Sequence, residues 1–333
     1  MTINLVGITT PSVASAIEAG GRLADVETRT VQADGLAALL VRSKASSWRV
    51  LRRSRAALRS MLSAQRILEA AAMYGPLLPA RPGTLIRNDA EAYMLLSSQR
   101  QYLAEGLRRH GKSRQFQITI TWDPAAALAA RRDHADVVAA AAVGANGAAG
   151  GAALMIHRFM SDQRATFEIE ATRALAAASE DMIALPVDEP DMLTNAVVLI
   201  APGAEPELER TLEALDRSLR GRNLIRLIGP LPPVSFAAVS IERPSRDRIS
   251  AARRLLGVGD ASKTCDLRRA YLDVARAHHP DTGADAAGAP IVGAAAEAFR
   301  LLVRVAEARS LGGHDDVLLV DILRQDQQRS LAT

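Results

Sequence analysis

The sequence predicts an α+β protein of two or three domains, and three observations support this prediction. The chain has 333 residues, which is long enough for two or three domains with a core each. Aromatic residues make up only 3% of it, so alanine and leucine must supply most of the packing, which favours close-packed helices over an aromatic-rich β-sandwich. Short runs that suit strands alternate with longer amphipathic stretches, as in an antiparallel sheet covered on one face by helices.

Residues 1–124 form the first predicted domain. Ala33-Asp34-Gly35 has the composition of a hairpin turn between two apolar runs. Asn88-Asp89 suits the N-cap of a helix that ends before Gly111. The expected strands span residues 3–8, 26–31, 36–41, 75–86 (interrupted by prolines) and 114–122, and the expected helices span 48–73 and 90–109.

Residues 125–153 read as an Ala/Gly-rich linker, and residues 154–243 as a second α+β domain. The uncharged stretch 137–156 has Asn146-Gly147 in its middle, a turn signal, and Ala and Gly bring little transfer energy into lipid, so we expect no membrane span. The second domain repeats the strand and helix pattern, and both sheet-plus-helix domains are expected to be ferredoxin-like. Its expected helices span 154–178 and 205–220, and its strands span 182–187, 196–201, 224–228 and 236–241.

A small all-helical module is predicted at residues 244–312, followed by a tail at 313–333. Its expected helices span 246–256, 266–278 and 291–308. The single cysteine, Cys265, cannot form an internal disulfide, and the N-terminus has no basic region followed by an apolar run. These features predict a cytoplasmic protein without a secretory signal.

An arginine-rich helix at 42–66 offers an alternative function. No acidic residue occurs between Asp34 and Glu69, and the net charge of the chain is +4. Such a face is most often solvated, but it could instead bind phosphates or an acidic protein surface. A nucleic-acid-binding regulatory protein is therefore the alternative hypothesis, although no aromatic platform, zinc spacing or helix-turn-helix accompanies the run.

Two proline-containing segments carry a family resemblance. The segment 229–236, GPLPPVSF, resembles the G-P-W/L-P-P-Y-S-F signature of the gas vesicle protein GvpF/GvpL family, with Val234 in place of an aromatic residue. The segment 78–84, LPARPGT, is similar to the L-P-L-R-F-G-T segment of the same family, with Pro82 in place of Phe. The two segments occur in family order, about 150 residues apart.

The helical module resembles a J-domain. Leu255-Leu256-Gly257-Val258, Arg268-Arg269-Ala270-Tyr271 and His279-Pro280-Asp281 follow that pattern, but Leu272-Asp273 stand where basic residues are usual. The resemblance implies contact with an Hsp70 chaperone. The residues it assigns to that contact are Arg268, Arg269, Arg276, His279, Pro280 and Asp281. Three helices that keep the loop and bind something else are the other interpretation.

Together these resemblances imply a non-enzymatic accessory or minor structural protein of gas vesicles, without cofactor or metal. It would bind the small shell subunit and other gas vesicle proteins during assembly, and it would recruit Hsp70 through the J-like module. The stiff segments should provide the partner-binding surface, because proline fixes the backbone. The residues expected to bind partners are Pro79, Gly83, Thr84, Gly229, Pro230, Pro232, Pro233 and Phe236. The hypothesis of an enzyme of unknown reaction is favoured only if a pocket with perturbed titratable groups lies near these residues.

Overall fold

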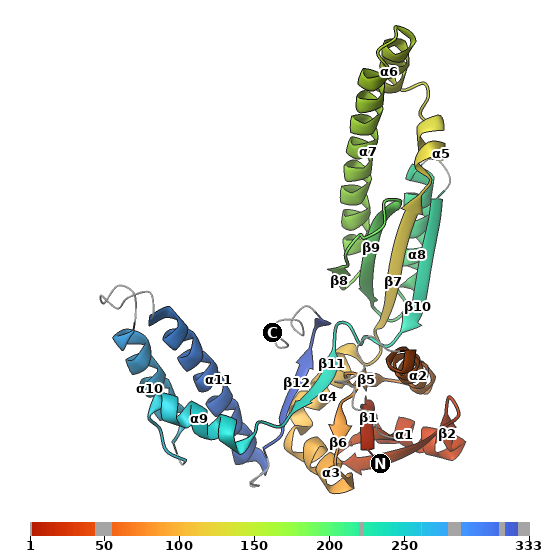
Figure 1. Cartoon of the computed structure of the whole chain (residues 1–333). Helices are drawn as coiled ribbons and strands as arrows, with labels where there is room; N and C mark the ends of the chain where they lie inside the picture. The colour runs from red at the N-terminus through yellow and green to blue at the C-terminus, as the bar shows by residue number, and fades with distance from the viewer. Residues whose placement is uncertain are drawn as a thin grey trace. The chain divides into compact units, whose positions relative to one another are not determined.

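The structure is a computed structural model that describes residues 2–43, 55–219, 223–260, 262–278, 288–312 and 317–325. Mixed helices and antiparallel sheets confirm the α+β class. The chain forms two compact units that interleave along the sequence (Figure 1). The first contains residues 1–58, 80–105 and 239–322, and the second contains residues 59–79, 106–238 and 323–333. The sequence-based domain bounds stay a prediction.

The sheet of the first unit confirms the strands predicted near the N-terminus. Its strands β1 (Thr2–Thr9), β2 (Arg22–Leu23), β3 (Val26–Ala33) and β4 (Leu36–Ser43) have the order β2-β3-β4-β1. The short β6 (Leu85–Ile86) pairs antiparallel with β1. Asp34 and Gly35 both have positive φ, 50° and 82°, as a two-residue hairpin of the I′ type requires. Helix α1 (Pro11–Gly20) follows β1.

The predicted helix 90–109 is two helices, α3 (Asp89–Ser98) and α4 (Arg100–His110). Asn88 caps α3 as expected, since its side chain accepts a hydrogen bond from the Glu91 N–H at 2.9 Å. The break falls at Gln99, directly after two serines, whose side chains compete for backbone hydrogen bonds and weaken a helix. Periodicity alone did not indicate this break.

The second unit contains an antiparallel sheet of β7 (Arg114–Trp122), β8 (Asp181–Ala184), β9 (Met192–Ile200) and β10 (Asn223–Leu231), in the order β10-β7-β9-β8. Helices α7 (Ala149–Ala177) and α8 (Glu205–Leu219) pack on one face of it (Figure 1). The shared core includes Ile118, Ile120, Leu175, Val198 and Leu212. Helix α2 (Arg55–Ala72) and strand β5 (Leu77–Pro79) precede this sheet in the sequence.

Residues 125–153, expected to be a linker, contain helices. They hold most of α5 (Pro124–Ala129), all of α6 (Ala135–Ala145) and the start of α7. Gly147, with φ of 86°, forms the turn that Asn146-Gly147 predicted. Alanine is the best helix former, and this preference outweighs the interspersed glycines. In the described part of the chain no helix combines the length and apolarity needed to cross a membrane.

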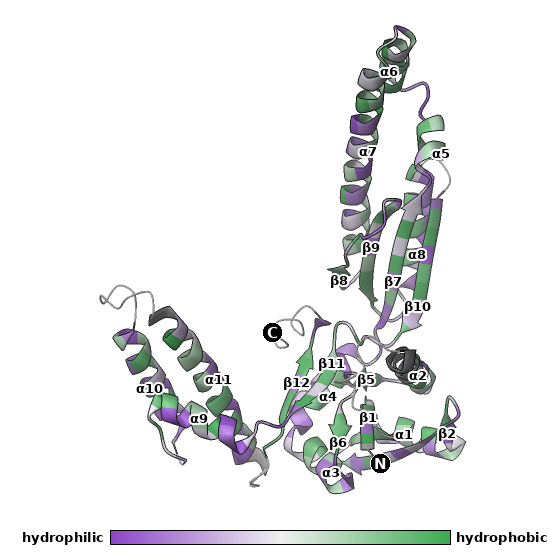
Figure 2. Ribbon diagram, in the orientation of Figure 1, coloured by the Kyte–Doolittle hydropathy of each residue, from purple (hydrophilic) through white to green (hydrophobic). Residues whose placement is uncertain are grey.

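The C-terminal region contains α9 (Arg246–Leu256), α10 (Thr264–Ala277) and α11 (Gly288–Gly312), close to the predicted bounds. Strands β11 (Ala238–Glu242) and β12 (Leu319–Leu323) flank the helices in sequence and pair with each other. Figure 2 shows green, hydrophobic residues interspersed with purple, hydrophilic ones along these helices. Their core includes Ile249, Leu256, Leu267, Leu302 and Val305.

Candidate functional site

The first proline-containing segment forms a tight, internally bonded turn. The Thr84 N–H and hydroxyl both donate to the Arg81 carbonyl, at 3.0 Å and 2.7 Å. Pro82 and Gly83 lie between them, and Gly83 has φ of 85°, as a type II turn requires at its third position. Pro79 and Thr84 are buried and Gly83 is exposed. Of these three predicted partner-binding residues, Gly83 alone offers surface to a partner.

The second segment is an irregular connection between β10 and β11. The peptide bond Gly229-Pro230 is cis, and the N–H groups of Val234 and Phe236 donate to the carbonyls of Pro232 and Pro233. Pro232, Pro233 and Phe236 are buried, whereas Gly229 and Pro230 are exposed.

The two strands joined by the second segment belong to different sheets. Strand β10 pairs with β7, and β11 pairs with β12. The Arg81 N–H, from the first segment, donates to the Val239 carbonyl of β11 at 2.8 Å. The structure therefore joins the first segment to the strand that follows the second one.

A residue near the C-terminus completes the surroundings of the second segment. The Arg324 guanidinium binds both carboxylate oxygens of Asp181, each at 2.9 Å. It also lies over the Phe236 ring, 5.8 Å from its centroid. The Gln325 N–H donates to the Ser235 carbonyl at 2.8 Å. Nothing in the sequence pattern indicated these contacts.

Replacing Arg324 with lysine should destabilise the protein by about 1 kcal/mol, because an ammonium cannot make the two-pronged bond to a carboxylate or stack on the ring as a guanidinium does. Chemical denaturation measures the loss. The exposed Arg158, on α7 of the same unit, provides the control, and Arg158→Lys should leave stability unchanged. Equal behaviour of the two variants would contradict the assigned contacts.

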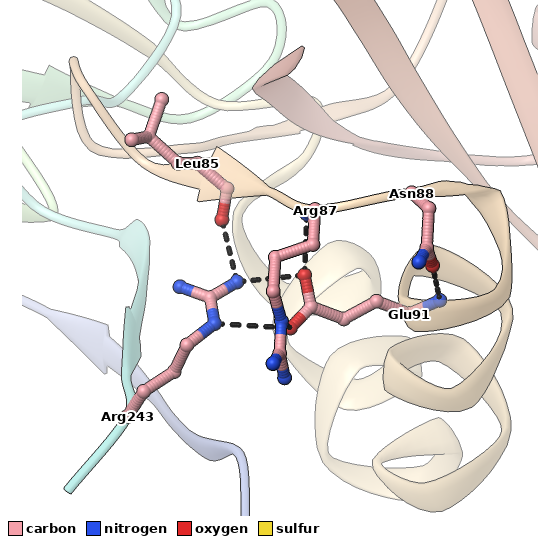
Figure 3. A network of polar contacts seen from close by, with 5 residues as sticks. All are labelled: Leu85, Arg87, Asn88, Glu91 and Arg243. Carbon is pink, nitrogen blue, oxygen red and sulfur yellow. Dashed lines mark hydrogen bonds and ion pairs between the residues drawn. The ribbon is translucent and has the colours of Figure 1, made fainter. Parts of the chain in front are cut away.

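A buried carboxylate lies at the centre of a cluster of polar contacts in the first unit (Figure 3). The Glu91 side chain is 2% exposed and accepts from the Arg87 N–H at 2.6 Å and from the Arg87 Nε at 2.8 Å. The Arg243 guanidinium donates to both Glu91 oxygens, at 3.0 Å and 2.8 Å, and to the Leu85 carbonyl at 2.7 Å. Sequence analysis missed this cluster. Glu91 stands three residues after the N-cap Asn88, a spacing that could have indicated a buried carboxylate at a helix start.

Opposing effects set the pKa of Glu91. Burial raises it, and the hydrogen bonds from Arg243 and from the backbone and side chain of Arg87 lower it, with the net result below its usual value. The carboxylate is therefore ionised and fully bonded at neutral pH. A carboxylate in that state has no proton to give and no free lone pairs directed at a substrate, so its role is structural.

The helical module contains three helices near the predicted bounds, and the residues of its predicted loop lie outside the described part. Arg268, Arg269 and Arg276 are exposed on α10. Phe299 of α11 stacks on Tyr271 of α10, with ring centroids 5.2 Å apart. The predicted loop His279-Pro280-Asp281 falls outside the described residues. The chaperone contact stays a prediction.

The arginine-rich segment is only partly described. Arg66 of α2 is exposed, and residues 44–54 lie outside the described part. No group of three or more His, Cys, Asp or Glu side chains that could hold a metal ion occurs among the described residues.

The comparisons with known proteins settle the family. A family model described as "Gas vesicle synthesis protein GvpL/GvpF" matches residues 6–238. The chain belongs to this family. Both proline-containing segments lie inside the matched range, which confirms the resemblance, and membership implies an accessory role in gas vesicles. No curated protein matches the sequence.

One solved structure shows a related fold, and a second one matches with a lower score. Gas vesicle protein GvpF from Anabaena sp. PCC7120 is 21% identical with a TM-score of 0.50, and the match covers 70% of this chain and 96% of that one. GvpF from Microcystis aeruginosa is also 21% identical with a TM-score of 0.47, and the match covers 70% of this chain and 97% of that one. Residues 239–333, which carry Arg243, Arg324 and the helices α9 to α11, lie beyond the family match.

Proposed function

We propose that this chain is a non-enzymatic accessory or minor structural protein that binds the small shell subunit and other gas vesicle proteins during assembly. The family match over residues 6–238 is the observation that carries the proposal. A strongly hydrophobic shell subunit exposes apolar surface before it enters the vesicle wall, and such surface aggregates unless another protein covers it. Covering that surface requires a shaped, stable partner and no bond-breaking chemistry.

The two proline-containing segments support a binding role through their rigidity. Proline fixes φ and each segment is closed by short backbone hydrogen bonds, so little conformational entropy is lost when a partner docks. Within them Gly83, Gly229 and Pro230 are exposed and available for contact. The buried members hold the segments in shape: Phe236, for example, packs against Ile183.

A pull-down of the shell subunit and other gas vesicle proteins with the tagged full-length chain tests the proposal. The chain is expected to retain the shell subunit. Substitution of the exposed Pro230 should reduce this retention, whereas substitution of the exposed Glu168 on α7 should not. Failure of the intact chain to retain any gas vesicle protein would rule the proposal out.

The J-like module adds an expected chaperone contact. Replacing His279 with Gln should remove most of the vesicle yield in cells and should abolish stimulation of Hsp70 ATP hydrolysis by the purified chain. His278→Gln, one position earlier, is the matched control and should leave both unchanged. An unaltered vesicle yield with His279→Gln would count against recruitment of the chaperone.

A further inference from the structure

Strand β10 forms one edge of the four-stranded sheet in the second unit, and within the described residues it pairs with β7 alone (Figure 1). In an antiparallel edge strand, every second residue directs its N–H and C=O away from the sheet. The side chains along this edge are also open to solvent: Leu224 is 65% exposed and Leu227 is 41% exposed. An exposed, apolar edge of this kind is a template for another strand.

The opposite edge of the same sheet, β8, is covered. The Arg324 side chain donates to the Met182 carbonyl of β8 at 2.8 Å and binds Asp181 at the start of that strand. Phe236 packs on Ile183 from the same strand. The chain thus protects one edge of the sheet with its own residues, whereas β10 has no such cover among the described residues.

The register shows that apolar side chains are only partly covered on both faces at this edge. Leu227 pairs with Ile118, so the two side chains point to the same face. Ile118 is fully buried beneath the helices, whereas Leu227 stays 41% exposed, although Ile225, two residues away on the same face, packs against the shared core. On the other face, Leu224 and Ile228 lie on either side of Arg226.

Arg226 provides a positive charge on this edge. Its side chain is exposed and makes no ion pair or hydrogen bond with any described residue. A segment lying beside β10 would place one side chain opposite Arg226, between two that face Leu224 and Ile228. Charge complementarity requires a carboxylate at that position and apolar residues around it.

We propose that β10 accepts an extended segment of a partner protein by strand addition, with an acidic side chain facing Arg226 and apolar side chains on either side. The proposal rests on the proposed function and names the chemistry of the partner segment. A second copy of β10 fits less well, because antiparallel pairing centred on this position would bring two Arg226 side chains together.

The usable length of the edge is short. The pairing of β10 with β7 is irregular between Ile228 and Leu231, and Pro230 has no N–H to donate. Strand addition therefore takes place along residues 223–228. Main-chain hydrogen bonds supply the affinity, and the side chain opposite Arg226 supplies the selectivity.

Fluorescently labelled peptides of sequence Thr-Val-Val-Glu-Val-Val-Thr, and the same sequence with Lys in place of Glu, test the proposal by anisotropy with the full-length chain. The Glu peptide should bind about fivefold more tightly than the Lys peptide, as one ion pair at a partly desolvated edge allows. Arg226→Glu should reverse this preference, and Arg158→Glu on exposed α7 should not. No preference, or a preference unchanged by Arg226→Glu, would overturn the proposal.

Backbone methylation separates strand addition from mere charge attraction. Two versions of the Glu peptide carry N-methyl groups at opposite sets of alternate positions. They differ only in which edge of the peptide can still pair with β10. One of the two should lose binding and the other should retain it, because a strand presents alternate N–H groups to each side. Equal binding by both would overturn strand addition.

Two further outcomes distinguish this proposal from the proposed function and from self-association. If the intact chain retains the shell subunit and Arg226→Glu retains it equally, the edge proposal fails while the proposed function stands. If the chain sediments as a dimer and Arg226→Glu strengthens or weakens that dimer, a second copy of the chain binds β10. The partner proposal is then overturned.

Discussion

Gly229→Ala is expected to destabilise the protein by about 3 kcal/mol. Gly229 has φ of 149°, a region that residues with a side chain enter at a cost of about 1–2 kcal/mol. A Cβ at this position would also lie 2.6 Å from Cδ1 of Phe116 and 2.9 Å from the carbonyl oxygen of Gln115. Both belong to β7, so the substitution pushes β10 from its neighbour, and overpacking of this kind adds about 1–3 kcal/mol.

Gly203→Ala is the matched control for this experiment. Gly203 has φ of 83°, but a Cβ there would meet nothing within 4 Å. Only the backbone cost applies, so we expect a loss of about 1 kcal/mol. Urea denaturation followed by circular dichroism measures both variants. Equal losses would mean that Gly229 is required only for its backbone angle and not for the close approach to β7.

Local features of the fold were predictable because their causes lie within a few residues. The turn at Asp34-Gly35 follows from residues that tolerate positive φ, and the cap at Asn88 follows from a side chain that accepts a hydrogen bond from a nearby N–H. The strand Arg114–Trp122 follows from its alternating pattern. Each signal is short-ranged, and each position agrees with the structure.

Features that depend on balances or on distant partners were not predictable. Residues 125–153 form helices because the helix propensity of alanine outweighs the effect of the glycines and of the turn signal. Composition alone does not show which of these effects is larger. Strands β10 and β11, adjacent in sequence, belong to different sheets. Long-range contacts decide which strands pair into one sheet, and these contacts produce no periodic pattern in the sequence.

The polar contacts around the candidate site show the same limit. Arg243 and Glu91 are 152 positions apart, and Arg324 and Asp181 are 143 positions apart. The two segments were predicted as binding surfaces from their resemblance to a family, but resemblance does not distinguish an exposed residue such as Pro230 from a buried one such as Phe236. Phe236 is buried in a cluster with Ile183, Val197 and Leu199, which lie far from it in the sequence, so no local pattern indicates its burial.

Glu91→Ala is expected to cost about 2–3 kcal/mol of stability. The change leaves Arg243 and the Arg87 N–H without their shared acceptor, and hydrogen bonds to charged groups contribute about 1.5–3 kcal/mol. The cost stays below that of a fully buried pair because Arg87 and Arg243 are 51% and 30% exposed, so water can replace part of the loss. Thermal or urea denaturation of the full-length chain measures it.

The pH dependence of stability isolates the charge of Glu91 from its shape. Its folded-state pKa is lowered, so its contribution is fully present above the unfolded-state value of 4.5 and is lost as the pH falls through the folded-state pKa. Glu91→Gln, which keeps the shape, should lose stability at pH 7 and should lose less than wild type on acidification. Glu297→Gln, which removes an exposed carboxylate from α11, is the control for the loss of one negative charge. If the free energy of unfolding of wild type and of Glu91→Gln fell equally with decreasing pH, the two arginines would not stabilise the Glu91 carboxylate. The cluster would then be a consequence of folding and not a cause of stability.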